Sequence, residues 1–136
     1  MPRILAIDYG KKRTGLAWTD PLKIIASAIG TIDTAQLDQE LKQRLAGDEV
    51  EAIVLGYPTR MDGSDSHVTE DVRKLAEKLK KQYPAKPVHL WDERFTSQMA
   101  FQAMIDAGLK KKKRRDKKLI DQISATIILQ EFLESR

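Results

Sequence analysis

Hydrophobic positions along the chain follow a strand-like pattern first and a helix-like pattern afterwards. Three strands are predicted at the start, over Arg3–Tyr9, Thr14–Thr19 and Ile24–Ile32. The first two are separated only by the turn Gly10–Arg13, which is short enough for a hairpin. The first part of the sequence is therefore expected to form three antiparallel strands.

Beyond these strands, helical and strand patterns alternate. Leucines recur every four residues over 37–45, which predicts a helix capped by Asp33 or Thr34. The further elements expected are a strand over Val50–Tyr57, a helix from about Val68 to Tyr83, a strand over Val88–Trp91, a helix from Thr96 or Ser97 to about Ala107, and a last helix from about Leu119 to Glu134. This order predicts an α/β fold with a mixed five-stranded sheet and helices on both faces.

The composition limits the class of protein. With 136 residues and 41% hydrophobic residues, the chain is expected to form one domain over residues 1–136. It has no cysteine and two histidines, which excludes a disulfide framework, a thiolate zinc site and a multi-histidine metal site. No apolar run approaches the ~20 residues of a membrane span. A cytoplasmic protein without a membrane partner is expected.

Positive charge is concentrated in one segment. The net charge is +4, but the stretch Lys110–Lys118 alone carries eight basic residues and one acidic residue. A basic loop is therefore expected at about 109–118, either as a solvated surface loop or as a contact for nucleic acid. The basic side chains of this loop are Lys110, Lys111, Lys112, Lys113, Arg114, Arg115, Lys117 and Lys118.

Acidic residues stand where strands or a helix would bring them to one edge of the sheet. Asp8 ends the first strand, and Asp92 and Glu93 follow the short strand that ends at Trp91. Adjacent strand residues point to opposite faces, so at most one of Asp92 and Glu93 can join Asp8, and the pattern leaves open which one. Each could also be structural, as a turn residue, a helix cap or a partner of Arg94.

Asp121 lies within the last predicted helix. Polar residues at Gln122, Thr126 and Gln130 mark the solvent side of that helix, which turns Asp121 toward the protein together with Ser124. An inward carboxylate is costly unless it is paired or binds a metal. A buried salt bridge is the alternative to a functional role.

Convergence of Asp8, Glu93 (or Asp92) and Asp121 would create an all-oxygen site. Such ligands favour Mg²⁺ or Mn²⁺, and two such ions can promote phosphodiester cleavage. Next to a basic loop, this arrangement predicts a metal-dependent nuclease.

Four motifs, in order, are similar to those of one family. They are the segment from Asp8 to Ala17 with Asp20-Pro21, then Gly56-Tyr57-Pro58 with Met61-Asp62-Gly63-Ser64, then Asp92 to Ser97, and finally Ile120-Asp121 with Ala125 and Ile128-Leu129-Gln130. Together they resemble the YqgF (RuvX) family, the small relatives of the RuvC Holliday-junction resolvases. The resemblance spans essentially the whole chain and implies a ribonuclease H-like fold.

The resemblance also implies an activity and its residues. It implies an endonuclease that matures the 5′ end of pre-16S ribosomal RNA, with Asp8, Glu93 and Asp121 as catalytic and metal-binding acids. Lys11, Lys12 and Arg13 would hold the nucleic acid or would simply form a basic turn, and Arg94 would orient a carboxylate. Two departures are Tyr57 in place of a common leucine, and the non-acidic Ser124 and Ala125 near the position of a fourth RuvC acid.

Three other functions remain open at this stage. The chain could resolve branched DNA, which would favour a two-fold dimer. It could be a nucleic-acid-binding or ribosome-assembly factor without catalysis, in contact with pre-ribosomal particles. An actin-like ATPase half is disfavoured, because such proteins need two domains around the nucleotide. A monomer or weak homodimer is expected.

Overall fold

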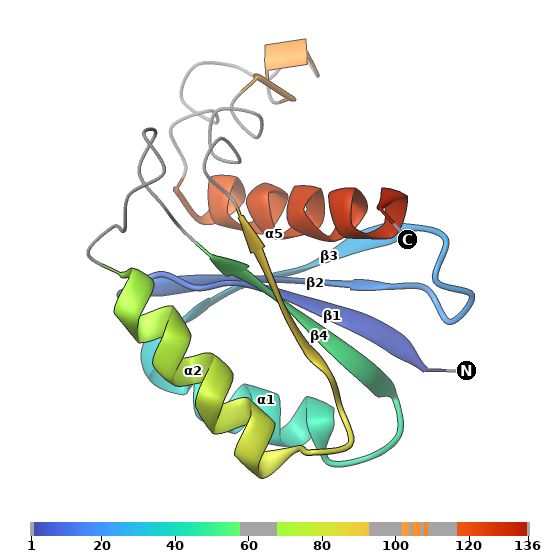
Figure 1. Cartoon of the computed structure of the whole chain (residues 1–136). Coiled ribbons are helices and arrows are strands. Elements are labelled where there is room, and N and C mark those ends of the chain that lie inside the picture. Colours follow the sequence, from blue (N-terminus) through green and yellow to red (C-terminus); the bar gives the residue numbers. More distant parts are fainter. Residues whose placement is uncertain are drawn as a thin grey trace.

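One five-stranded sheet organises the chain in a computed structural model (Figure 1). The structure describes residues 2–57, 68–92, 102–103, 105–106, 108 and 117–135, without the side chains of 57, 117, 118 and 121. The strands are β1 (Arg3–Asp8), β2 (Arg13–Thr19), β3 (Ala26–Asp33), β4 (Val50–Tyr57) and β5 (Val88–Asp92). They lie in the order β3-β2-β1-β4-β5.

The sheet is mixed, as predicted. β1 pairs antiparallel with β2, and β2 pairs antiparallel with β3. On the other side of β1, β4 and then β5 run parallel to it. The carboxyl ends of β1, β4 and β5 therefore meet at one edge of the sheet, where ligands of α/β proteins usually bind.

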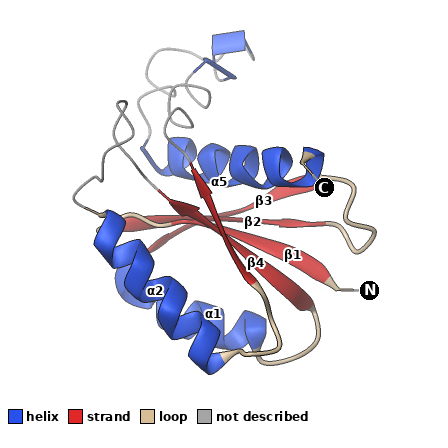
Figure 2. Cartoon of the chain, viewed as in Figure 1, coloured by secondary structure: helices blue, strands red, loops and turns tan. Residues whose placement is uncertain are grey.

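Helices cover both faces of the sheet, which confirms the predicted α/β architecture (Figure 2). Helices α1 (Leu37–Leu45) and α2 (Thr69–Gln82) lie on one face, and α5 (Lys117–Glu134) lies on the other. Two apolar cores result, one on each side of the sheet. Leu5 and Ile7 of β1 belong to the α1/α2 core, whereas Ile4 and Ala6 belong to the α5 core.

Two helix starts differ from the sequence prediction. A short 3-10 turn over Thr34–Gln36 precedes α1, and neither Asp33 nor Gln36 makes a side-chain cap hydrogen bond. Helix α5 begins at Lys117, so Lys117 and Lys118 belong to its first turn rather than to the basic loop. Lysine is a good helix former, and this preference outweighs the unfavourable position of cations at a helix N-terminus.

The rest of the predicted basic loop, residues 109–116, lies outside the described residues, as does most of the helix expected up to Ala107. Residues 102–103 and 105–106 are helical. No helix in the described part of the chain is both long and apolar enough to cross a bilayer.

Candidate active site at the carboxyl edge of the sheet

Asp8 is the last residue of β1, and its side chain lies on the α5 face of the sheet. Side chains alternate along a strand, so Asp8 follows Ile4 and Ala6, both of which pack in the α5 core. Its cross-strand partner on β2 is Gly15. Asp8 is half-buried and has an interaction of its own within the structure. The central strand therefore delivers one carboxylate to the edge beneath α5.

The neighbouring strands place a glycine and a tryptophan beside Asp8. The register pairs Ile7 with Leu55 on β4, so Asp8 is level with Gly56, and Gly56 pairs with Trp91 on β5. Trp91 packs in the α5 core and meets the ring of Phe132 edge-on at 5.9 Å. Gly56 therefore contributes no side chain to the α5 face between Asp8 and Trp91. The sequence motifs contained Gly56, but its place beside Asp8 depends on the register.

Asp92 lies on the opposite face of the sheet from Asp8. It alternates with Trp91 and shares the face of Val88, which packs against the α1/α2 core. Asp92 is exposed and has an interaction within the structure. The two acids therefore do not share one face. Glu93 and Arg94 lie outside the described residues.

Helix α5 covers the face on which Asp8 lies. It packs across β2, β3 and β1, with Ser124, Ala125, Ile128 and Leu129 buried. Asp121 occupies the helical position one turn before Ala125. Figure 1 shows that α5 starts at the same end of the sheet at which β4 and β5 finish. The backbone of residue 121 thus belongs to the start of the helix above the candidate edge.

A buried hydroxyl lies near the start of α5. Ser124 is 1% exposed, and its Oγ has no hydrogen-bond partner in the described part of the structure. A buried polar group without a partner carries a free-energy cost, so such atoms are rare away from functional sites. Ser124 lies three residues after Asp121, which is within one helical turn.

A carboxylate such as that of Asp8 is a ligand that hard divalent cations prefer. Helix α5, which covers the same face, also carries the unpartnered Ser124 hydroxyl. No group of three metal-ligating side chains forms among the side chains that the structure describes, a set that excludes Glu93 and Asp121. The carboxylate of Asp8 is compatible with such an ion, and the ligand set stays a prediction.

The turn after Asp8 carries three cations. Lys11 and Lys12 are exposed and Arg13 is half-buried, with Asp33 as its register partner on β3. Of the other predicted nucleic-acid contacts, residues 110–116 lie outside the described residues. Lys117 and Lys118 are placed only as the start of α5. Of the two predicted basic groups, the described residues thus include all of the one that follows Asp8 by three to five residues.

Tyr9, next along the chain, turns away from this face. It packs against the α1/α2 core and lines a hollow with Asp38 and Asp71. Burial raises the pKa of the Tyr9 phenol, and the negative charges of Asp71 and Asp38 raise it further. Tyr9 is thus kept protonated on the face opposite Asp8.

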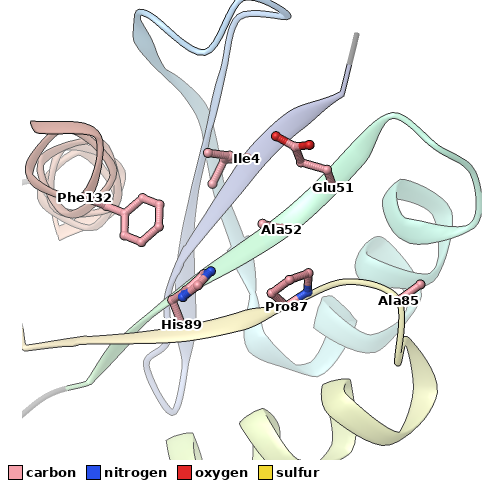
Figure 3. A pocket seen from close by; sticks show the side chains of 7 residues that line it. All are labelled: Ile4, Glu51, Ala52, Ala85, Pro87, His89 and Phe132. Atoms are coloured by element: carbon pink, nitrogen blue, oxygen red, sulfur yellow. The ribbon is translucent and has the colours of Figure 1, made fainter. Parts of the chain in front are cut away.

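A larger hollow lies at the other end of the sheet (Figure 3). Its volume is about 640 Å³, and its lining includes Ile4, Ala52, His89 and Phe132. The rings of His89 and Phe132 are tilted by 43°, with centroids 5.0 Å apart. Ile4 lies near the start of β1, so this hollow is separate from the edge at which Asp8 lies.

The fold defines the class of protein first. The sheet order and the helices on both faces are those of a ribonuclease H-like fold. RuvC of Thermus thermophilus, solved in complex with a Holliday junction substrate, superposes with a TM-score of 0.57 at 16% identity, over 100% of this chain and 96% of that chain. A second Thermus thermophilus RuvC structure gives a TM-score of 0.54 at 14% identity, over 98% and 95% of the two chains.

The family follows from the sequence comparisons. Residues 2–135 match the RuvX family, described as Holliday junction resolvase, and the chain belongs to that family. The protein from Christiangramia forsetii, named "Putative pre-16S rRNA nuclease", is 51% identical over 98% of both chains. Proteins of the same name from Phocaeicola vulgatus and Porphyromonas gingivalis are 50% and 49% identical, over at least 98% of each chain. The predicted family and fold are confirmed.

Proposed function

We propose that the chain is a nuclease that hydrolyses phosphodiester bonds in RNA, acting in the maturation of the 5′ end of pre-16S ribosomal RNA. The observation that carries the proposal is the place of Asp8, at the carboxyl end of the central strand, under α5 and three residues before the first of the cations Lys11, Lys12 and Arg13. The full-length similarity to proteins named as pre-16S rRNA nucleases supports the reaction class and the RNA.

The proposed acids are Asp8, Glu93 and Asp121. The position of Asp92 on the opposite face from Asp8 favours Glu93 over Asp92, because strand alternation would return residue 93 to the face of Trp91. Asp121 is favoured by its place one helical turn before the buried Ala125. Arg94 would orient one of these carboxylates.

These carboxylates would hold one or two Mg²⁺ or Mn²⁺ ions. Such ions supply Lewis-acid stabilisation of the charge on the phosphoryl and leaving oxygens. The half-buried Asp8 contributes a carboxylate held by the central strand, so that little reorganisation is needed when substrate arrives. The scissile phosphate would lie between Asp8 and Trp91, where Gly56 contributes no side chain.

The basic groups would hold the strand being cut. Lys11, Lys12 and Arg13 follow Asp8 after only Tyr9 and Gly10, so phosphates that contact them would lie near the carboxylate. The basic segment 110–118 precedes α5 and would contact phosphates farther along the substrate. A cytoplasmic monomer or weak homodimer that acts on pre-ribosomal particles fits this activity.

A second candidate substrate is branched DNA. It is favoured by the description of the family as Holliday junction resolvase. Resolution of a junction requires two cuts related by two-fold symmetry, hence a dimer. The non-acidic Ser124, where RuvC enzymes are expected to carry a fourth acid, weighs against direct transfer of the resolvase mechanism.

Cleavage of two substrates in parallel tests the proposal. One is a short structured RNA that carries the 5′ flank of pre-16S RNA, and the other is a four-way junction DNA, each with Mg²⁺ or Mn²⁺. We expect the wild type to cut the RNA, and we expect Asp8→Asn and Asp121→Asn to lose the cut while they still fold. If only the junction is cut, branched DNA and not RNA is the substrate. Binding of both without cleavage would identify a non-catalytic assembly factor.

A further inference from the structure

The turn that joins β1 to β2 is narrow. It begins at Gly10, two residues after Asp8, and a Cβ atom on Gly10 would overlap the carbonyl oxygen of Arg13. Lys11 and Lys12 lie within this turn, and both are exposed. The path of the backbone therefore decides where the two ammonium groups can reach relative to Asp8.

Thr34, which directly follows β3, makes two hydrogen bonds to this turn and one to Thr14 of β2. Its hydroxyl donates to the Gly10 carbonyl oxygen at 2.5 Å, and its backbone N–H donates to the Lys12 carbonyl oxygen at 3.0 Å. Since the Thr34 proton is used toward Gly10, the hydroxyl of Thr14 donates to Thr34 Oγ1 at 2.9 Å. Thr14 is fully buried, which anchors the network in the sheet.

The sequence position of Thr34 suggests a helix cap, but its side chain forms hydrogen bonds with distant residues. No residue at the start of the adjoining 3-10 turn or of α1 makes a side-chain cap hydrogen bond. The partners of Thr34 through its hydroxyl are instead 20 and 24 residues distant along the chain. Its hydrogen bonds therefore brace the basic turn rather than the helix that follows.

We infer that Thr34 is a positioning residue. Its hydrogen bonds fix the backbone of the turn Gly10–Arg13, and the fixed backbone holds Lys11 and Lys12 where they contact the substrate phosphates near Asp8. The inference rests on the proposed function for the meaning of that turn. It assigns to Thr34 no contact with the substrate. Loss of its hydroxyl would leave the cations present but no longer held in place, and small displacements of positioning groups have large effects on rate.

A double-mutant cycle tests the inference in the full chain. Thr34→Val removes the hydroxyl and keeps the branched shape, and Thr34→Ser restores the hydroxyl. The second pair in the cycle is Lys11→Ala with Lys12→Ala, alone and combined with Thr34→Val. Thr19→Val is the matched control, because Thr19 is also buried, and its hydroxyl accepts a hydrogen bond from Ile4 N–H at the other end of β2.

We expect Thr34→Val to lower kcat/KM for the RNA about tenfold, Thr34→Ser to recover most of it, and Thr19→Val to lower only the melting temperature. When both lysines are absent, Thr34→Val should change kcat/KM by less than about threefold, because the two ammonium groups that Thr34 positions have been removed. An equal effect of Thr34→Val in both backgrounds, or an equal loss of activity in Thr19→Val, would overturn the inference.

Failure of the proposed function is recognised separately. If the wild type cuts no RNA, the same cycle is read from RNA binding as a function of salt, in which lost phosphate contacts lower the slope. If the salt dependence of RNA binding is smaller in Thr34→Val and recovers in Thr34→Ser, the positioning role of Thr34 is supported without any nuclease activity. An unchanged slope would refute it.

Discussion

Asp8 and Asp92 end two parallel strands of one sheet, yet their side chains lie on opposite faces. Asp8 shares the α5 face with Ile4 and Ala6, whereas Asp92 lies on the face opposite Trp91, which is the face of α1 and α2. Because of this relationship, we propose the α5 face, on which Asp8 lies, for the chemistry. Asp121 is carried by the helix that covers the same face.

The turn next to Asp8 depends on a glycine for steric reasons. A side chain at Gly10 would overlap the Arg13 carbonyl oxygen, whereas a Cβ on Gly47 would meet nothing within 4 Å. We expect Gly10→Ala to lower the free energy of unfolding by about 1–3 kcal/mol and to reduce cleavage. Gly47→Ala should stay within about 0.5 kcal/mol of wild type. Urea unfolding of both variants makes the comparison, and equal effects would show that the turn relaxes freely.

The unpartnered hydroxyl of Ser124 predicts a stabilising substitution. Ser124→Ala removes a buried polar atom that has no hydrogen bond among the residues the structure describes. In the absence of divalent cations, we expect the free energy of unfolding to rise by about 1 kcal/mol. Calorimetry in the presence of a chelator measures this. A loss of stability of similar size would mean that the hydroxyl has a partner in the folded protein.

Asp20 predicts a pH dependence of stability. Its carboxylate accepts hydrogen bonds from the backbone N–H groups of Ile25, Ile24 and Leu22, and these bonds hold its pKa below the usual value. A lowered folded-state pKa gives stability above the unfolded-state pKa of about 3.9, and this stability is lost as pH falls through the folded value. We therefore expect Asp20→Asn to be less stable than wild type at pH 7.

The difference between the two proteins should vanish at acidic pH, once the wild-type carboxyl group is also neutral. Unfolding in urea at pH 7 and near pH 2.5 provides the measurement. A gap that persists unchanged at the lower pH would show that the charge of Asp20 does not contribute.

The basic segment predicts a salt dependence. Replacement of Lys110, Lys111, Lys112 and Lys113 by serine should weaken RNA binding and flatten the plot of log affinity against log salt, because fewer counterions are released. Filter binding between about 50 and 200 mM salt detects the change. The melting temperature should stay near the wild-type value. An unchanged slope would exclude this segment from the RNA interface.

Much of the fold could be predicted from local sequence patterns, but the face of the sheet on which each acidic side chain lies could not. The strands were predictable because apolar runs such as Val50–Tyr57 end at proline or glycine, and helices because leucines recur at the helical period. β1 is buried on both faces, so its sequence is a continuous apolar run. Such a run does not indicate which side chains face α5 and which face α1 and α2. Placing Asp92 on the face opposite Asp8 consequently required the register and the side on which α5 packs.

Thr34 shows the same limit at a single residue. Its type and place before a leucine repeat are typical of a helix cap. Its side chain is hydrogen-bonded to Gly10 and Thr14 instead, and these residues come close to Thr34 only when β3 pairs with β2. Contacts of this range leave no periodic signal in one sequence.

The central claim, that the acids on the α5 face perform the chemistry, is tested most directly by comparing Asp8→Asn with Asp92→Asn. Both variants exchange a carboxylate for an isosteric amide at the end of a parallel strand. RNA cleavage with Mg²⁺ is measured at equal concentrations of folded protein. We predict a loss on the order of a thousandfold for Asp8→Asn and activity close to wild type for Asp92→Asn. An active Asp8→Asn, or an Asp92→Asn that is equally inactive while folded, would contradict the account.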